Sequence, residues 1–174
     1  MALSLDRCVA PLLAALVACT PALDWREVRI DDAALLALFP CRPQRRMRDV
    51  SVAGATVQLE IVACGAEGST FAVGHFAASD PARVTDQIDE LRRATIANVG
   101  ATEALEVPFP LAGATPNRAA GRLRLSGKMP DGAVVREHAV FFVRGLRIYQ
   151  VSVIGAAPPP AAVENFIANL KFAP

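Results

Sequence analysis

The stretch 134–154, VVREHAVFFVRGLRIYQVSVI, decides the fold class, because it holds two long apolar strand patterns around one tight turn. The pair Arg144-Gly145 has the composition of such a turn, and one strand is expected on each side of it. A preceding segment, 120–128, alternates leucine with basic residues and predicts a third strand. These three strands predict an antiparallel meander in the second half of the chain.

The first half of the chain is rich in shorter strand patterns. In the segment 56–63, Val57, Leu59 and Ile61 alternate with polar residues, as in a strand with one buried face. Similar patterns predict further strands at 25–30, 34–39, 45–52 and 70–77. The segment 103–117 contains Pro108, Pro110 and Pro116, which cannot donate backbone hydrogen bonds, so we expect an extended connector there.

Two helices complete the expected elements. The first begins at Asp80-Pro81, because aspartate caps free amides and proline suits the first turn, and it ends at Gly100. Its apolar stripe consists of Val84, Ile88, Leu91, Thr95 and Val99. The second helix follows the three prolines at 158–160. The sequence therefore predicts an α+β domain with a predominantly antiparallel sheet, on which a mid-chain helix and a C-terminal helix pack.

The order of these elements resembles a known superfamily over residues 25–172. An FPCRP corner at 39–43 follows an early strand, then come the mid-chain helix, the late meander and a closing helix that ends at Asn169-Leu170-Lys171-Phe172. This order resembles the PsbP/Mog1-like α/β/α sandwich of small bacterial envelope proteins. The resemblance implies an accessory, binding or chaperone-like module. It transfers none of that superfamily's functional residues to this chain.

The N-terminus predicts export and lipidation. The apolar segment 9–18 is too short to cross a bilayer and fits the core of a secretory signal. It ends in Leu16-Val17-Ala18-Cys19, which resembles the bacterial lipobox. The resemblance implies a signal peptide at 1–18, a lipidated Cys19, a tether at 19–24 and one domain at 25–172. The residue after Cys19 is Thr20 and not the aspartate that signals retention in the inner membrane. The resemblance therefore implies the periplasmic face of the outer membrane. An ordinary signal peptide and a soluble periplasmic protein remain the alternative.

The remaining cysteines point in the same direction. Cys8 lies in the expected signal, so the mature domain keeps Cys41 and Cys64. Two cysteines in an oxidising compartment predict one disulfide. Two buried free thiols, a nucleophilic cysteine or half of a metal site are the alternatives. We expect no metal, because the sequence has neither a CxxC pair nor a nearby histidine pair.

Composition and motifs indicate a folded domain without a recognisable active site. Of the 174 residues, 53% are hydrophobic and 20% are charged, which excludes a disordered chain. Nucleotide, metalloprotease and nucleophile-elbow motifs are absent, and we expect no cofactor. Glu137 and His138 are neighbours in a strand and should project to opposite faces, so they are not expected to act together. His75 is expected to be an ordinary strand position, and the Asp31-Asp32 pair is expected to be solvated surface or helix-start charge.

Charge distribution provides the one candidate surface. Net charge is only +1, but basic residues cluster in two of the predicted strand regions. These candidates for binding an anionic partner are Arg42, Arg45, Arg46, Arg48, Arg122, Arg124 and Lys128. If the basic faces meet in one sheet, they suit anionic lipid headgroups, peptidoglycan carboxylates or an acidic protein. A solvated sheet face is the alternative. Nucleic acid is not expected, because no aromatic platform accompanies the arginines.

The sequence thus predicts a lipid-anchored binding or assembly module of the cell envelope, attached to the membrane by its N-terminal lipid and not catalytic. Its partner is expected to be an anionic envelope component or a protein. The alternatives are a small periplasmic enzyme of the hydrolase type with a dispersed active site, and a secretion-chaperone-like protein of the same fold.

Overall fold

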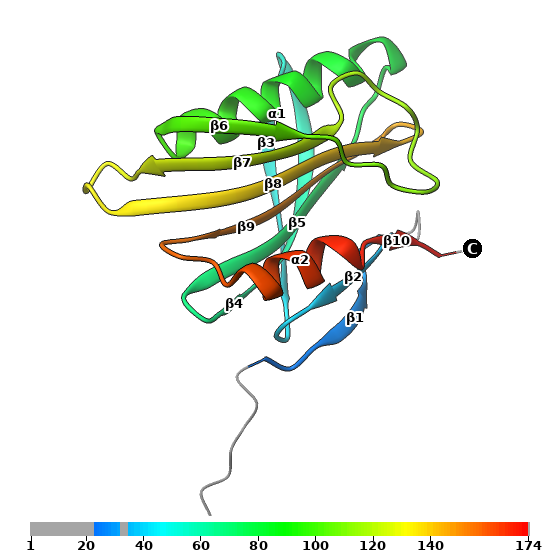
Figure 1. The fold of residues 1–174 in the computed structure, drawn as a ribbon. Coiled ribbons are helices and arrows are strands. Elements are labelled where there is room, and N and C mark those ends of the chain that lie inside the picture. The colour runs from blue at the N-terminus through cyan, green and yellow to red at the C-terminus, as the bar shows by residue number, and fades with distance from the viewer. Residues whose placement is uncertain (1–22, 32–34, 174) are drawn as a thin grey trace, which may run out of the picture.

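The computed structural model describes residues 23–31 and 35–173, which form three layers around one large sheet (Figure 1). The sheet has seven strands, and all neighbouring strands are antiparallel. In spatial order they are β3 (Gln44–Val52), β4 (Ala55–Ala66), β5 (Ser69–Ala77), β9 (Arg147–Gly155), β8 (Val134–Arg144), β7 (Gly121–Lys128) and β6 (Ala101–Val107). The meander predicted from the sequence is β7, β8 and β9.

One face of this sheet is covered by α1 (Val84–Asn98), and the other by α2 (Pro160–Ala168) together with a small second sheet. The small sheet consists of β1 (Arg26–Arg29), β2 (Leu35–Phe39) and β10 (Lys171–Phe172), with β2 in the middle. The structure therefore confirms a mixed, mostly antiparallel architecture with a mid-chain helix and a C-terminal helix. Within the described residues, no helix combines the length and the apolarity needed to cross a bilayer.

The layer beneath α2 is held together by aromatic packing. Phe166 of α2 lies edge-on to Phe39 of β2 and to Phe71 of β5, with ring centroids 5.0 and 5.4 Å apart. Phe142 stacks on Tyr149 with centroids 4.8 Å apart. Each such pair contributes about 1 kcal/mol beyond the area it buries. This packing joins α2, the small sheet and the central strands into one core.

The layer beneath α1 has a separate core. Ile88 of α1 is completely buried and belongs to a cluster with Phe76 and Phe141 of the sheet. Asp80 accepts a hydrogen bond from the Ala82 amide at 2.9 Å, in the short 3-10 turn that precedes α1, as expected for a cap. The central strands consequently bury side chains on both faces, because each face carries its own layer.

The two edge elements differ from expectation. The segment 103–117, predicted as a connector, contains most of β6, which pairs with β7 at the far edge of the sheet. The apolar alternation is lost in β6 because its five inner residues are all exposed. The strand β10 was not predicted either, because two residues are too few for any periodicity. The strand β6 forms by pairing with β7, the next strand along the chain, whereas β10 pairs with β2 near the other end of the chain.

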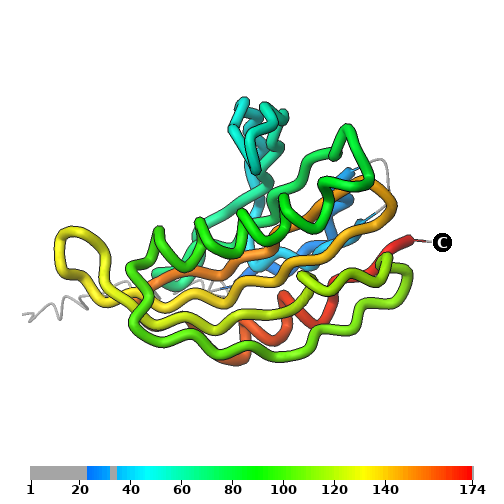
Figure 2. Tube along the Cα trace, turned by 90° about the horizontal axis from the view of Figure 1, so that it is seen from above, coloured from blue at the N-terminus to red at the C-terminus, as the bar shows by residue number. Residues whose placement is uncertain are grey.

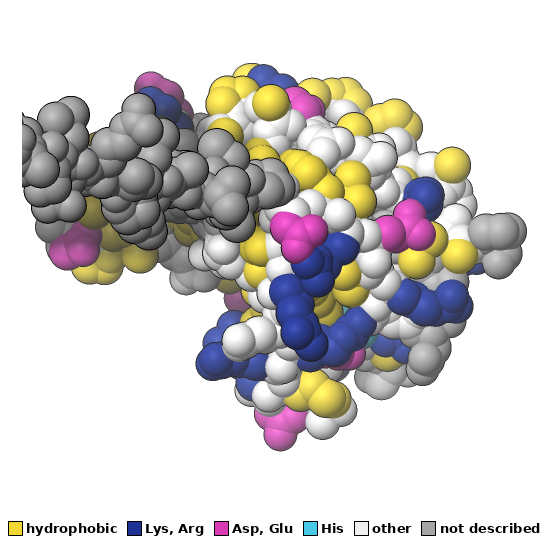
Figure 3. Space-filling view, turned by 90° about the horizontal axis from the view of Figure 1, so that it is seen from below, with side chains coloured by type: hydrophobic (Ala, Val, Ile, Leu, Met, Phe, Trp, Pro, Cys, Tyr) yellow, Lys and Arg dark blue, Asp and Glu magenta, His cyan; other side chains and the backbone are white. Residues whose placement is uncertain are grey.

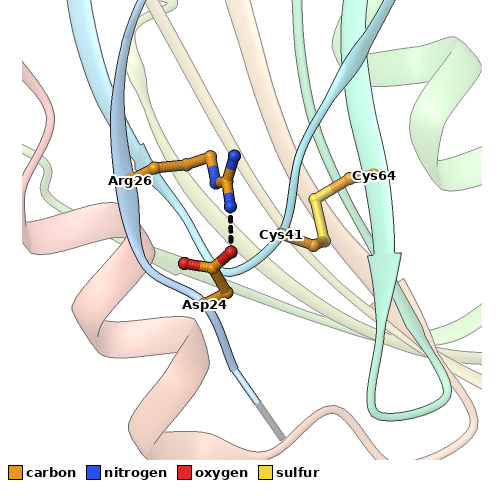
Figure 4. The surroundings of a disulfide bond; sticks show 4 residues. All are labelled: Asp24, Arg26, Cys41 and Cys64. Atoms are coloured by element: carbon orange, nitrogen blue, oxygen red, sulfur yellow. Dashed lines mark hydrogen bonds and ion pairs between the residues drawn. A yellow bond between two sulfur atoms is a disulfide. The ribbon is translucent and has the colours of Figure 1, made fainter. Parts of the chain in front are cut away.

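A disulfide joins the small sheet to the large one. Cys41 follows β2 and Cys64 lies in β4, and their Cα atoms are 6.0 Å apart (Figure 4). The predicted pairing is therefore confirmed. Near it, Arg26 donates a hydrogen bond to Asp24 at the entrance to β1. The disulfide closes a loop over a sequence separation of 23, which in the chain-entropy model stabilises the fold by about 3 kcal/mol.

Replacing both cysteines, Cys41→Ser with Cys64→Ser, should lower the free energy of unfolding by about 3 kcal/mol, because the unfolded chain gains the freedom of the opened loop. Urea denaturation with and without reductant measures this loss. Thr70→Ser, a small change beside the bond, serves as the control. Equal stability of oxidised and reduced wild-type protein would contradict the expectation.

Candidate functional site

The strand β3 lies at one edge of the large sheet and pairs only with β4. Seen from above, the hairpin of β3 and β4 stands out from the plane of the other strands (Figure 2). Residues 44–49 are all exposed, in contrast to the buried central strands. Because side chains alternate along a strand, Arg46 and Arg48 face the α1 side, whereas Arg45 faces the α2 side.

Two hollows lie beside this hairpin, and the second of them reaches α1. One hollow of about 400 Å³ is lined by Arg42, Arg46 and Thr70 and reaches the Cys41–Cys64 disulfide. A second, of about 260 Å³, contains Arg48 on the hairpin, residues of α1, and Gln150 and Ser152 of β9. Both hollows include Ile61 in their walls, so they lie next to each other, and we call them together the arginine groove.

The arginine groove is basic, and no acidic residue is among the described residues that line it. Arg42, Arg46 and Arg48 are exposed. No hydrogen bond or ion pair links them to another residue in the described part of the chain, and neither hollow is lined by Asp or Glu. The floor is apolar, with Ala63 and Ala72 beside Ile61. The groove therefore suits a ligand that carries negative charge on an apolar framework or on one that resembles a polypeptide backbone.

The fourth arginine of this cluster has a structural role. Arg45 lies 2.7 Å from Glu60 and donates a hydrogen bond to the carbonyl oxygen of Ile30 at 2.8 Å. It also donates to the carbonyl oxygen of Arg29. Since its guanidinium is occupied by these acceptors, Arg45 fastens the end of β1 to the large sheet and is not part of the groove.

The second predicted basic cluster lies on the opposite face. Arg122 is only 6% exposed, and its two terminal nitrogens contact the Glu164 carboxylate of α2 at 3.0 and 2.7 Å. Arg124 lies 4.0 Å from the same carboxylate, whereas Lys128 is exposed at the end of β7. The hydrogen bond from Arg122 holds the pKa of Glu164 below its usual range. Arg122 therefore secures α2 to the sheet and is closed to an external anion.

The two basic clusters share one sheet but do not form one surface. Five strand-to-strand steps separate β3 from β7, about 24 Å at the usual spacing. The groove arginines face α1, whereas Arg122 and Arg124 face α2. The sequence predicted a joint binding face only if the two basic clusters met on one face of the sheet, and they do not. Of the predicted basic residues, only Arg42, Arg46 and Arg48 make a coherent candidate site.

Glu137 and His138 project to opposite faces, as predicted. Glu137 accepts a hydrogen bond from Ser152 at 2.7 Å on the α1 side, and burial raises the pKa of its carboxyl group. His138 accepts from Arg122 at 3.0 Å on the α2 side, and burial lowers the pKa of its ring. Because the sheet separates them, these two residues cannot act on one substrate.

A buried polar cluster, which the sequence did not indicate, lies between the small sheet and the large one. Asp31, expected on the solvated surface, has a side chain only 2% exposed, and this expectation is wrong. Its carboxylate accepts a hydrogen bond from the Tyr149 hydroxyl at 2.6 Å and lies 3.2 Å from Arg147. Burial and this hydrogen bond raise the pKa of the Tyr149 hydroxyl. The partners are 118 residues apart, so no local pattern could reveal them.

His75 continues the same cluster. Its Nδ1 lies 3.3 Å from Arg147, and its Nε2 lies 3.3 Å from the carboxylate of Glu60. Because Arg147 is a donor, Nδ1 must be the acceptor and is not free to take a proton from a substrate. The described residues that line the hollow here, which has a volume of about 280 Å³, include no serine or cysteine. The geometry is that of a clamp between two sheets and not of a nucleophilic active site.

Figure 3 shows the molecule from below. Lys and Arg side chains gather near the middle of this face, with acidic side chains among them (Figure 3). Among the described residues that line the two hollows of the arginine groove there are arginines and no carboxylate. Cations without an internal partner attract an external anion.

Comparisons with known proteins leave the site to be interpreted from its own geometry: the sequence matches no protein-family model and no curated protein. The class that the structure defines is a mixed α+β domain with a mostly antiparallel sheet. No group of His, Cys, Asp and Glu in residues 23–31 and 35–173 is arranged to hold a metal ion. Cys19, the predicted lipidation site, lies outside the described residues.

Asp31→Ala should lower the free energy of unfolding by about 3 kcal/mol, because Arg147 and Tyr149 would lose their shared buried partner. Asp49→Ala is the matched control, since Asp49 is an exposed aspartate on β3. Urea denaturation of both variants measures the difference. The clamp interpretation is contradicted if the two substitutions cost the same.

The clamp also makes stability depend on pH. Burial lowers the pKa of His75 below its ordinary value of 6.5, so the unfolded chain binds this proton more readily than the folded one. The free energy of unfolding should therefore decrease as the pH falls through 6.5. His75→Gln should flatten this decrease, as measured by urea denaturation at several pH values. His138→Gln removes the other histidine whose pKa is lowered and should remove a separate part of this decrease. Unchanged slopes in both variants would refute the assignment.

Proposed function

We propose that this protein is a lipid-anchored, non-catalytic binding module of the bacterial cell envelope, which holds an anionic partner in the arginine groove. One observation carries the binding proposal: Arg42, Arg46 and Arg48 line two adjacent hollows, and no acidic residue is among the described residues of their walls. Side chains that are not used to stabilise the fold are available to a ligand. Arginine forms paired hydrogen bonds to carboxylates and phosphates, which fits both classes of envelope anion.

The fold supports a binding role of the kind seen in PsbP/Mog1-like domains, to which we assign this chain as part of the proposal. The order of elements matches the resemblance noted in the sequence, and helices lie on both faces of the central sheet. Fold likeness alone does not define a ligand, so the argument for anion binding rests on the groove.

The proposed location rests on two features. The tetrad 16–19 resembles a lipobox, and the lipid on Cys19 would tether the domain through a short segment to the periplasmic face of the outer membrane. The Cys41–Cys64 disulfide is of the kind that persists in oxidising compartments such as the periplasm. A soluble periplasmic protein is the outcome if the lipid is absent.

The groove proposal is tested by neutralising its arginines together. The triple substitution Arg42→Gln, Arg46→Gln and Arg48→Gln should weaken binding to anionic probes by about a hundredfold, at roughly 1 kcal/mol for each charge. The probes are vesicles containing phosphatidylglycerol and, separately, polyglutamate, with co-sedimentation and fluorescence anisotropy as the measurements. Because the three side chains have no partner in the described residues, the variant should retain its stability.

The control removes the same charge elsewhere. Arg124→Gln, Lys128→Gln and Arg136→Gln carry the same change on strands β7 and β8, and binding should remain close to that of the wild type. If both triple variants lose binding equally, the attraction is a general charge effect and the groove is not the site.

The anchoring proposal is tested by mass spectrometry of the mature protein from its native membrane. The chain should begin at Cys19 and carry a diacylglyceryl group there, and Cys19→Ala should abolish the modification and release the protein from the membrane. An unmodified Cys19, or a chain that retains Met1, would overturn the proposal.

A further inference from the structure

The outer edge of β3 offers unpaired backbone groups. The strand is nine residues long and lies at the end of the strand order, so among the described residues only its inner edge is paired. In a strand with one neighbour, alternate N–H and C=O groups along the other edge remain available to another strand. Exposure along residues 44–49 leaves this edge accessible in the described structure.

The charges on β3 have the repeat of an extended chain. Arg46 and Arg48 are two residues apart on the same face, which places their Cα atoms about 6.6 Å apart. An extended peptide places its own alternate side chains at the same interval. Acidic residues at alternate positions of an added strand would therefore lie opposite these arginines, as cross-strand pairs.

The opposite face of β3 favours a different kind of side chain on the added strand. Met47 lies between Arg46 and Arg48 in sequence, projects to the α2 side and is 60% exposed. Arg45, its neighbour on that side, is already bound to Glu60. An apolar side chain on the added strand would cover Met47. The edge thus specifies a partner segment in which acidic and apolar residues alternate.

We propose that β3 receives an extended, acidic segment of a partner protein, which pairs with its free edge as an additional strand of the large sheet. This inference rests on the proposed anion-binding function of the groove and names the class of its ligand. Backbone pairing supplies affinity, and the arginines select for acidic side chains on the groove face.

Charge also explains why β3 would remain open to such a partner. Two β3 strands from separate copies that paired about Met47 would bring Arg46 against Arg48, which disfavours this self-pairing. At the far edge of the sheet, β6 carries Glu103 and Glu106, but Glu106 is bound to Arg92 at 2.9 Å. The edge of a second copy therefore offers less acidic character than the β3 edge requires, and a different protein is favoured.

The experiment uses the mature chain and three synthetic peptides labelled for fluorescence anisotropy. The first alternates glutamate with valine, the second alternates lysine with valine, and the third is the glutamate peptide with N-methyl groups on alternate amides of its pairing edge. The glutamate peptide should bind, and the lysine peptide should not. N-methylation should weaken binding by about tenfold or more, because it removes the donors of the added strand while keeping the charge.

The variant Arg46→Gln with Arg48→Gln should weaken binding of the glutamate peptide by about tenfold, whereas Arg124→Gln with Arg136→Gln should leave it unchanged. If the N-methylated peptide binds as well as its parent while the Arg46/Arg48 variant still loses binding, strand addition is overturned and the anion-binding function stands. If the groove variant retains all anionic binding, the proposed function fails as well. Binding to phosphatidylglycerol vesicles without binding to the peptide assigns the groove to lipid and overturns the inference.

One further outcome concerns self-association. Sedimentation equilibrium of the mature chain should show no concentration-dependent oligomer that depends on β6. An oligomer abolished both by Glu103→Lys and by Arg46→Gln with Arg48→Gln would identify a second copy as the occupant of the edge and overturn the assignment to a different protein.

Discussion

The central strands β8 and β9 have to bury both of their faces, and the rest of the structure follows from this constraint. Phe141 and Phe142 are neighbours in β8 and are both buried, one beneath α1 and the other beneath α2. A sheet that is apolar on both sides requires a cover on each side. Here α1 supplies one cover, and α2 with the small sheet supplies the other.

The second cover is fastened by buried polar contacts as well as by aromatic packing. Asp31 holds the end of the small sheet against Tyr149 and Arg147, and Glu164 holds α2 against Arg122. A buried charge without a partner is strongly unfavourable, so each pair specifies how the covering element docks. The disulfide adds a covalent link between the same two sheets. Some of the charged residues that suggest a binding surface in the sequence therefore form ion pairs that hold the layers together.

The same constraint leaves the β3 edge uncovered. The two layers protect the middle of the sheet, whereas β3 extends beyond them with its arginines and Met47 exposed. Exposed charge protects an edge strand from pairing indiscriminately. It also restricts pairing to a complementary strand. The proposed function thus lies where the fold stops covering its own sheet, which explains why the arginines of the groove lack partners among the described residues.

The sequence by itself determined the local elements: the meander around Arg144-Gly145, the capped helix after Asp80, the Cys41–Cys64 pair and the arginine cluster on β3. Each depends on alternation, turn chemistry or composition within a short segment, which are properties that the chain expresses locally. The exposed strand β6 escaped prediction because an edge strand needs no apolar face. Only the tertiary structure decided that the two basic clusters face opposite ways, that Arg122 is closed by Glu164, and that Asp31 meets Tyr149. Alternation tells which residues share a side of one strand, whereas the order and register of distant strands determine which sides become a core, a clamp or an open edge.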